Sequence, residues 1–460
     1  MTKRTLSGLS VRPVKTGLRR LGVALALAVS STAQAELPNP LTLDYVLSAP
    51  LAELPQLSLQ QAKMNKLQSQ MESQDAQDGL QLDIVGRLAW RDYAEKTEDY
   101  HLAALHAKQT IYDFDRNQHK LDALAASRDA ENTLYGDTEQ QFKLQLMQGY
   151  FNVLLADFQY RIDNEGMAVA YVALDKAKDR LELKRISDVD YLQIENDYQK
   201  ILVKRQRSEM NQLKTRIALA NMLGQPKARP DELSFPKLEN YAKRNDKDLQ
   251  LDSLQQQVLE QNTQLNALKQ QLQAAQFQLQ SQQAGNKPNI SFDAWAGKLS
   301  SYPEIREGNW NIGLTVDVPL YDGGLTSAKV SEAKADMQAI QAKMRLLEQQ
   351  LRDEVADLYF QLKMLQAEKK QNQAFGDYAD LYLDYSRALY ENETATDLGD
   401  SMVRLSEANY QQVAWKFKQA LLWAKLDYLM GKEMFSAKAD VQPSRKQEDS
   451  SSEPMQGNQS

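Results

Sequence analysis

The side chains of this chain that could carry chemistry are three histidines and a small number of carboxylates. Neither a Glu-x-x-His pairing nor any other metal-ligand spacing surrounds His101, His106 and His119, so we expect solvated residues there and no metal site. The absence of cysteine excludes disulfides, thiolate zinc sites and cysteine nucleophiles. No GxSxG, Walker or Rossmann motif is present. The sequence therefore predicts no enzyme activity, no metal and no cofactor.

Carboxylates gather at two places that resemble helix starts. Asp188 follows Ser187, while Asp397 and Asp400 lie three residues apart, a spacing that puts two side chains on one face of a helix. A carboxylate at a helix start accepts hydrogen bonds from backbone N–H groups that have no partner within the helix. Helix capping is therefore one role for these groups, and it needs no binding partner.

The helices that must position these residues are predicted by where proline is missing. No proline lies between Pro55 and Pro226, or between Pro319 and Pro443. Because proline breaks helices, these stretches permit long helices. Helical periodicity predicts the first at residues 115–185, and we expect the second at 324–393, each followed by a return helix. Residues 246–284 have apolar side chains at steps of three and four with glutamine between them, which is typical of a coiled coil.

Four shorter segments alternate between apolar and polar residues, which is a strand signal. They form two hairpins, at residues 80–111 and 289–319, with strands of about ten residues, the length that crosses a bilayer as a tilted strand. Trp90, Trp295 and Trp310 lie in these strands, which suits a girdle of aromatic side chains at a membrane interface. The core of a small soluble sheet is the alternative for these aromatic residues.

The chain repeats itself after 209 residues. This shift lays Tyr112-Asp113 on Tyr321-Asp322 and Tyr150-Phe151 on Tyr359-Phe360. We expect a first repeat at 36–224, a linker or collar at 225–245, a second repeat at 246–435 and a disordered tail at 436–460. The expected fold class is mainly α with β. Because open sheet edges are not tolerated in lipid, the four strands of one chain would need other chains to close them.

Composition and the first residues restrict the location. The net charge of −7 without a basic block makes a nucleic-acid partner a poor fit. Mean hydropathy is −0.60, and no run of about 18 apolar residues follows residue 35, which excludes a bundle of spanning helices. Residues 1–35 have a basic start, an apolar run and Ala-Gln-Ala at 33–35, which predicts a cleaved signal peptide and an exported protein.

The end of the second hairpin resembles a signature of the TolC-type outer membrane efflux protein family. The residues that carry it are Pro319, Tyr321, Asp322, Gly323 and Gly324, and Tyr112-Asp113 is a degenerate first copy. The resemblance implies a homotrimer with a twelve-stranded outer-membrane β-barrel continuous with a long α-helical periplasmic barrel. It further implies a passive exit duct of a tripartite efflux pump or type I secretion system. Its partners would be outer membrane lipid, a periplasmic adaptor and an inner membrane pump of RND, ABC or MFS type.

The same resemblance gives the acidic segments a second role. Asp397 and Asp400, with Ser187 and Asp188 in the first copy, match the turns at the periplasmic aperture of that family, where carboxylates around a narrow mouth favour cations. A basic residue expected near the second turn is replaced by Glu393, so we hypothesise that Arg185 latches the closed state. A structural or adhesive trimeric coiled-coil envelope protein without a pore is the alternative function.

Overall fold

The computed structural model describes residues 37–51, 54–92, 97–99, 101–244, 249–301, 306–392 and 398–432. The predicted signal peptide at 1–35 and the predicted tail at 436–460 lie outside the described residues and stay predictions. Within the described part of the chain, no helix is long and apolar enough to cross a membrane.

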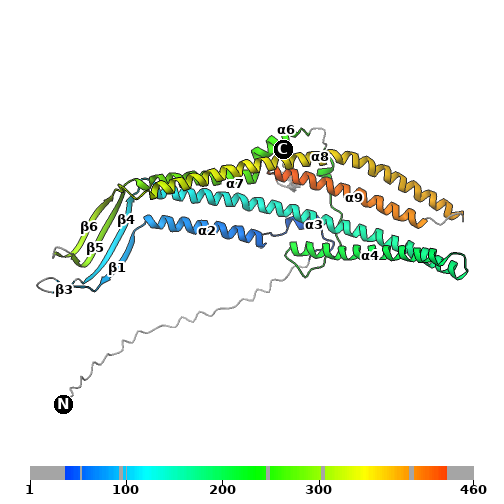
Figure 1. Ribbon diagram of the computed structural model, residues 1–460, viewed down its shortest axis with the longest axis horizontal. Coiled ribbons are helices and arrows are strands. Elements are labelled where there is room, and N and C mark those ends of the chain that lie inside the picture. Colours follow the sequence, from blue (N-terminus) through cyan, green and yellow to red (C-terminus); the bar gives the residue numbers. More distant parts are fainter. Residues whose placement is uncertain are drawn as a thin grey trace, which may run out of the picture. The chain divides into compact units, whose positions relative to one another are not determined.

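Two helices of equal length dominate the fold. Helix α3 (Arg116–Glu182) and helix α8 (Leu325–Glu391) each have 67 residues, and both their starts and their ends are 209 residues apart. At 1.5 Å per residue each is about 100 Å long. Each packs against a return helix, α4 (Asp188–Met222) beside α3 and α9 (Leu398–Leu429) beside α8 (Figure 1). The division into two repeats stays a prediction, and these matching helices support it.

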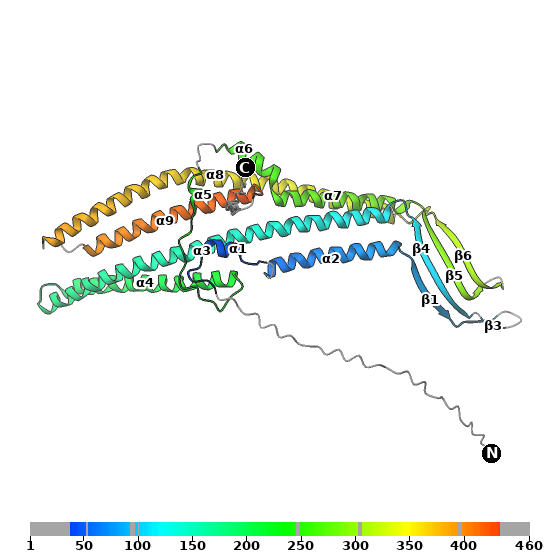
Figure 2. The same ribbon diagram turned by 180° about the vertical axis from the view of Figure 1, so that it is seen from behind.

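The remaining helices lie along these two pairs. Helix α1 (Leu43–Ser48) and helix α2 (Pro55–Asp78) pack on α3, as the view from behind shows (Figure 2). Helix α6 (Leu251–Gln261) contacts α8, and α7 (Thr263–Gln283) lies between α3 and α8. The short helix α5 (Glu239–Ala242) contacts α9 and lies within residues 225–245, the predicted linker.

The stretch predicted as one coiled coil at 246–284 is two helices. The break falls at Asn262, which is 3% exposed. Its side-chain oxygen accepts a hydrogen bond from the backbone N–H of Leu265 at 3.0 Å, and its amide donates to the carbonyl of Leu429 at 3.1 Å. An asparagine that satisfies backbone groups in this way favours a helix start over a helix interior. Helix α7 therefore begins afresh and is anchored to the end of α9.

Four strands form one antiparallel sheet in the order β1-β4-β5-β6. These are β1 (Gln81–Arg87), β4 (Leu102–Tyr112), β5 (Asn289–Ser301) and β6 (Arg306–Asp317). The predicted first strand ends earlier than expected, because residues 90–92 form a separate strand, β2 (Trp90–Asp92), that pairs with β3 (Thr97–Asp99). The central β4–β5 pairing joins the two hairpins predicted from the sequence into one sheet.

The main apolar core lies where the helix pairs meet. Phe151 of α3 and Phe417 of α9 are both 1% exposed, and their rings stack at 4.2 Å. Tyr150, which is fully buried, donates its hydroxyl to the carbonyl of Leu41 at 2.8 Å. The core thus packs the segment before α1 and helix α9 against helix α3.

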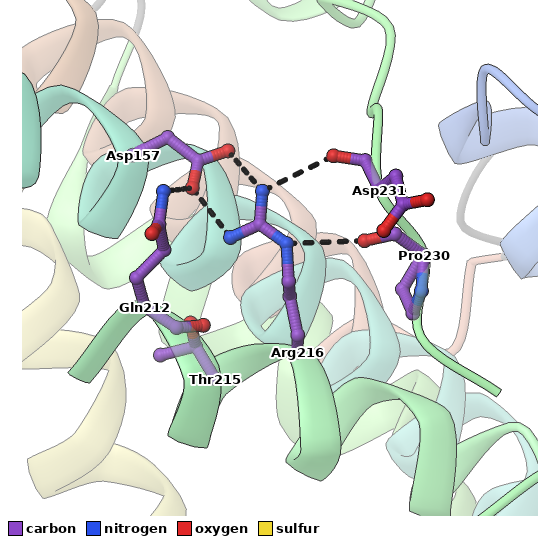
Figure 3. Close-up of polar contacts among 6 residues, drawn as sticks. All are labelled: Asp157, Gln212, Thr215, Arg216, Pro230 and Asp231. Atoms are coloured by element: carbon purple, nitrogen blue, oxygen red, sulfur yellow. Dashed lines mark hydrogen bonds and ion pairs between the residues drawn. The ribbon is translucent and has the colours of Figure 1, made fainter. Parts of the chain in front are cut away.

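An arginine network fastens the linker to the first repeat (Figure 3). Two nitrogens of Arg216 in α4 lie 2.6 and 2.9 Å from the two carboxylate oxygens of Asp157 in α3. The same guanidinium donates to the carbonyls of Pro230 at 3.0 Å and Asp231 at 3.3 Å. Gln212 adds a bond to Asp157 at 2.8 Å. One planar group with five donors therefore joins two helices and the linker.

Candidate functional site: the sheet and the helix turns

One face of the four-stranded sheet is apolar and exposed. Ile84, Leu105, Ala296 and Trp310 lie opposite one another across β1, β4, β5 and β6 and form one row of this face. Ile84 is 88% exposed and Trp310 is 71% exposed. The exposed apolar side chains that continue the face are Leu82, Ile111, Ile312, Leu314 and Val316. A contiguous apolar surface of this kind marks a contact with lipid or with another protein.

The other face of the sheet is polar. Asp83, His106, Trp295 and Asn311 form the adjacent row, one residue away from the apolar row on each strand. His106 Nε2 lies 2.7 Å from a carboxylate oxygen of Asp293, and the indole N–H of Trp295 donates to the other oxygen at 2.6 Å. The two rings stack at 3.9 Å. A strand whose faces alternate between apolar and polar is typical of membrane β-barrels, in which the polar face lines the interior.

These rows separate the three tryptophans that the sequence analysis grouped together. Trp310 lies on the apolar face, where a membrane-interface role remains a proposal. Trp295 lies on the polar face with its indole nitrogen bonded to Asp293, so the expectation of a girdle residue does not fit it. Trp90 begins β2, is 68% exposed and meets the ring of His101 edge-on at 4.9 Å. No cluster of potential metal ligands occurs among the described residues.

The predicted strand-to-helix motif begins α8. Pro319 lies just after the end of β6, and the carboxylate of Asp322 accepts hydrogen bonds from the backbone N–H groups of Gly324 at 3.0 Å and Thr326 at 2.7 Å. Hydrogen bonds from the side chain and backbone of Thr326 hold the pKa of Asp322 below its ordinary value. Gly323 and Gly324 have φ angles of 68° and 87°, a region that favours glycine. The motif therefore redirects the chain from strand to helix.

The first copy makes the same transition without glycine. Asp113 accepts a hydrogen bond from the backbone N–H of Asn117 at 2.7 Å, as Asp322 does from Thr326. Phe114 and Asp115 take the left-handed backbone, with φ angles of 57° and 63°, at the positions of Gly323 and Gly324. The strand-end tyrosines of the two copies, Tyr112 and Tyr321, are both exposed.

At the first helix turn, Asp190 caps the helix and Asp188 does not. Ser187 and Asp190 form a reciprocal capping box: the serine oxygen accepts from the Asp190 N–H at 3.1 Å, and the Asp190 carboxylate accepts from the Ser187 N–H at 3.3 Å. Sequence reasoning chose Asp188 and missed Asp190, although a serine followed three residues later by an acidic residue was the signal. Asp188 is exposed in the first turn of α4.

At the second turn, Asp400 lies in the first turn of α9, and its carboxylate accepts a hydrogen bond from Nε of Arg404 at 2.8 Å. Arg404 was not predicted, although an acid and a base four residues apart on a helix was the signal. Asp397 lies outside the described residues. The exposed Arg185 forms no ion pair among the residues that are described, so its latch role remains a hypothesis.

Residues 254–432 match the model of a family described as outer membrane efflux protein. This part of the chain is an outer membrane efflux protein domain. The match confirms the resemblance seen in the sequence, and it covers α7, the second hairpin, α8 and α9. No curated protein matches the chain.

Solved structures extend the likeness beyond the efflux protein domain. A membrane protein from Pseudomonas aeruginosa has 16% identity and a TM-score of 0.68, covering 85% of this chain and 92% of that chain. CusC has 18% identity and a TM-score of 0.66, covering 86% and 93%. VceC from Vibrio cholerae has 16% identity and a TM-score of 0.64, covering 85% and 96%. The chain therefore has the fold of TolC-like channels, and the family domain supports an outer membrane efflux channel.

A groove near the helix turns joins the efflux protein domain to the first repeat. It has a volume of about 430 Å³ and is lined by α3, α4 and α9. Its charged lining consists of Asp163, Asp197, Asp400, Glu407 and Lys204. The side chain of Asp163 is only 2% exposed and pairs with Lys204 at 3.0 Å. Asp197 pairs with Lys200 at 2.9 Å and Asp400 with Arg404 at 2.8 Å, so among these acids only Glu407 forms no ion pair with a described residue.

Proposed function

We propose that three copies of this chain form the outer membrane exit duct of a tripartite efflux pump or type I secretion system, with passive passage and no chemical step. The exposed apolar face of the four-stranded sheet carries this proposal. Removing apolar surface from water contributes a favourable free energy of about 25 cal/mol per Å². Covering this face with lipid or protein therefore stabilises the sheet. The opposite face, with Asp83, His106 and Asp293, suits a water-filled interior.

The sheet edges support assembly from several copies. Strands β1 and β6 are the outer strands of the order β1-β4-β5-β6, and each has one neighbour among the described strands. Because neighbours in the sheet are antiparallel, β1 and β6 run in opposite directions, so β6 of one copy can pair antiparallel with β1 of the next. Closure removes the unpaired backbone groups that lipid does not tolerate.

The helices also leave apolar side chains uncovered within one chain. Among the elements described, α4 packs mainly on α3, while α8 packs on α6, α7 and α9. Large apolar side chains remain exposed on both helices: Val189, Leu192, Val203 and Leu213 on α4, and Leu346, Phe360, Leu381 and Tyr385 on α8. Contacts between copies along these helices would close a tunnel of helices in the same trimer that closes the barrel.

The groove near the helix turns suits the periplasmic adaptor. The carboxylate of Glu407 would attract a basic side chain of the partner, and apolar lining residues such as Val169 and Ile201 would contact its apolar side chains. Asp188 and Asp400 lie at the starts of α4 and α9, where three copies would place carboxylates around one mouth.

Membrane fractionation and single-channel recording test the proposal together. The mature chain should be recovered in the outer membrane, and the purified protein should give discrete, uniform conductance steps in planar lipid bilayers. Recovery as a soluble monomer would contradict the proposal. A trimer in the membrane that never conducts, even after the turn carboxylates are neutralised, would favour the pore-less fibre.

A further inference from the structure

A pocket that the duct account does not use lies between the linker helix α5 and the pair α8–α9. It has a volume of about 360 Å³. Its walls combine aromatic and cationic side chains, which are Tyr241, Trp415, Trp423, Arg244, Lys369 and Lys416. No aspartate or glutamate lines it in the part of the chain that the structure describes. Its volume suits a ligand about the size of one ring.

Two walls of this pocket are held in place by contacts of their own. The guanidinium of Arg244 lies 4.7 Å from the ring centre of Trp423, which is 6% exposed. The same guanidinium donates hydrogen bonds of 2.7 and 2.8 Å to the carboxylate of Asp427. Across the pocket, the indole N–H of Trp415 donates to the carbonyl of Leu365 at 2.8 Å. The ring faces are therefore ordered before any ligand arrives, which lowers the entropy cost of binding.

The charges of the pocket are not balanced by its own lining. The negative charge of Asp427 balances the positive charge of Arg244, but Lys369 and Lys416 form no ion pair among the described residues. The ammonium of Lys369 lies 5.6 Å over the Trp415 ring. Lys418, two residues further along α9, differs because it pairs with Glu368 at 2.7 Å. Two ammonium groups beside an aromatic wall thus remain available for a negatively charged group.

We propose that this pocket binds an organic anion, a carboxylate attached to a flat aromatic or sugar face. The ring stacks on Trp415, and the carboxylate accepts hydrogen bonds from Lys369 and Lys416. Bound there, the ligand bridges the linker helix and the second repeat. The inference concerns a site apart from the duct, and it stands or falls independently of the transport proposal.

Equilibrium binding to the purified full-length protein tests the site, with tryptophan fluorescence and calorimetry as readouts. Three probes separate the chemistries: indole-3-acetate carries an aromatic carboxylate, N-acetylmuramate carries a sugar carboxylate, and N-acetylglucosamine is a similar sugar without the carboxylate. At least one acid should saturate the protein with a Kd of about 1 mM or below, and the neutral sugar should bind about tenfold more weakly.

Matched lysine variants assign the binding to this pocket. Lys416→Gln and Lys369→Gln should each weaken binding of the acid about tenfold, whereas Lys418→Gln, on the same helix, should leave the affinity unchanged. The proposal is overturned if neither acid saturates, if N-acetylglucosamine binds as well as the acids, or if Lys418→Gln weakens binding as much as Lys416→Gln. Because single-channel conductance plays no part in this assay, failure here leaves the duct proposal untouched.

Discussion

Asp400 and Arg404 face each other one turn apart at the start of α9, with 2.8 Å between a carboxylate oxygen and Nε. Arg404 also lies 5.7 Å over the ring of Tyr382 in α8, so the pair bridges the two helices of the second repeat. The carboxylate that resembles an aperture group is therefore partly neutralised within its own chain.

Removing this arginine should make the mouth of the duct more negative. In Arg404→Gln, the glutamine keeps a polar side chain while Asp400 loses its charged partner, so we expect stronger preference for cations over anions. The reversal potential of single channels under a KCl gradient measures that preference. Asp400→Asn should shift the potential in the opposite direction, and identical potentials in both variants would show that Asp400 does not line the pore.

Close contact at Gly399 should limit what that position tolerates. A Cβ added there would lie 2.7 Å from Cγ2 of Val169 in α3, a β-branched side chain with few χ1 rotamers in a helix. We expect Gly399→Ala to lower the free energy of unfolding by about 1–3 kcal/mol through overpacking. Gly136→Ala in α3 is the control, because nothing lies within 4 Å of its added Cβ and alanine is the better helix former. Equal thermal midpoints for both variants would refute the close approach.

The arginine network should determine whether the linker stays attached to the first repeat. Arg216→Ala leaves Asp157 with Gln212 alone and frees the carbonyls of Pro230 and Asp231, so we expect a loss of about 3 kcal/mol. Faster limited proteolysis between residues 224 and 235 is the measurement. Arg229→Ala, whose guanidinium bonds carbonyls of its own turn, should cleave at the wild-type rate. Cleavage unchanged in Arg216→Ala would contradict this role.

Asp137 should make stability depend on pH. Its carboxylate is 6% exposed and accepts hydrogen bonds from Gln264 at 2.8 Å and Tyr428 at 3.2 Å, and burial raises its pKa above the ordinary value of 3.8. The folded state therefore holds this proton more tightly than the unfolded state. The contribution of Asp137 to the free energy of unfolding is fully present below its unfolded pKa, and it is lost as the pH rises through its folded pKa.

An asparagine at position 137 cannot titrate, so Asp137→Asn should remove this loss of stability with rising pH. Thermal midpoints of Asp137→Asn and of the wild type, measured from pH 4 to pH 8, should differ increasingly in favour of the variant as pH rises, once groups common to both are subtracted. Parallel curves would mean that Asp137 does not titrate differently in the folded chain.

The long helices and the strands could be predicted because their signals are local. Helical periodicity within the proline-free stretches gave bounds for α3 and α8 that differ from the structure by a few residues, and alternation indicated the strands of the sheet. Alternation also places Trp295 on the same face as Asp293, since one residue separates the two, whereas the presence of tryptophan in a strand does not indicate its face. The break at Asn262 needed the carbonyl of Leu429, which is distant in the sequence.

The groove and the pocket could not be predicted from the sequence. Asp163, Asp197 and Glu407 come from three helices, and no local pattern indicates that they surround one groove. Likewise, Arg244 stands 183 residues before Asp427, the carboxylate that fixes it. Such sites depend on how helices from both repeats pack together.

The central claim is that β1 and β6 of neighbouring copies pair and close one barrel, and engineered disulfides test it most directly because the chain has no cysteine. Ile84→Cys on β1 is combined in turn with Cys at Trp310, Ile312 or Leu314 on β6, since a disulfide needs Cα atoms about 4.4–6.8 Å apart. Oxidation in intact outer membranes should give, for at least one pair, a reducible ladder on a denaturing gel that stops at the trimer. Each single-cysteine variant should stay monomeric. Monomers throughout the series, or ladders that extend past the trimer, would contradict closure by three chains.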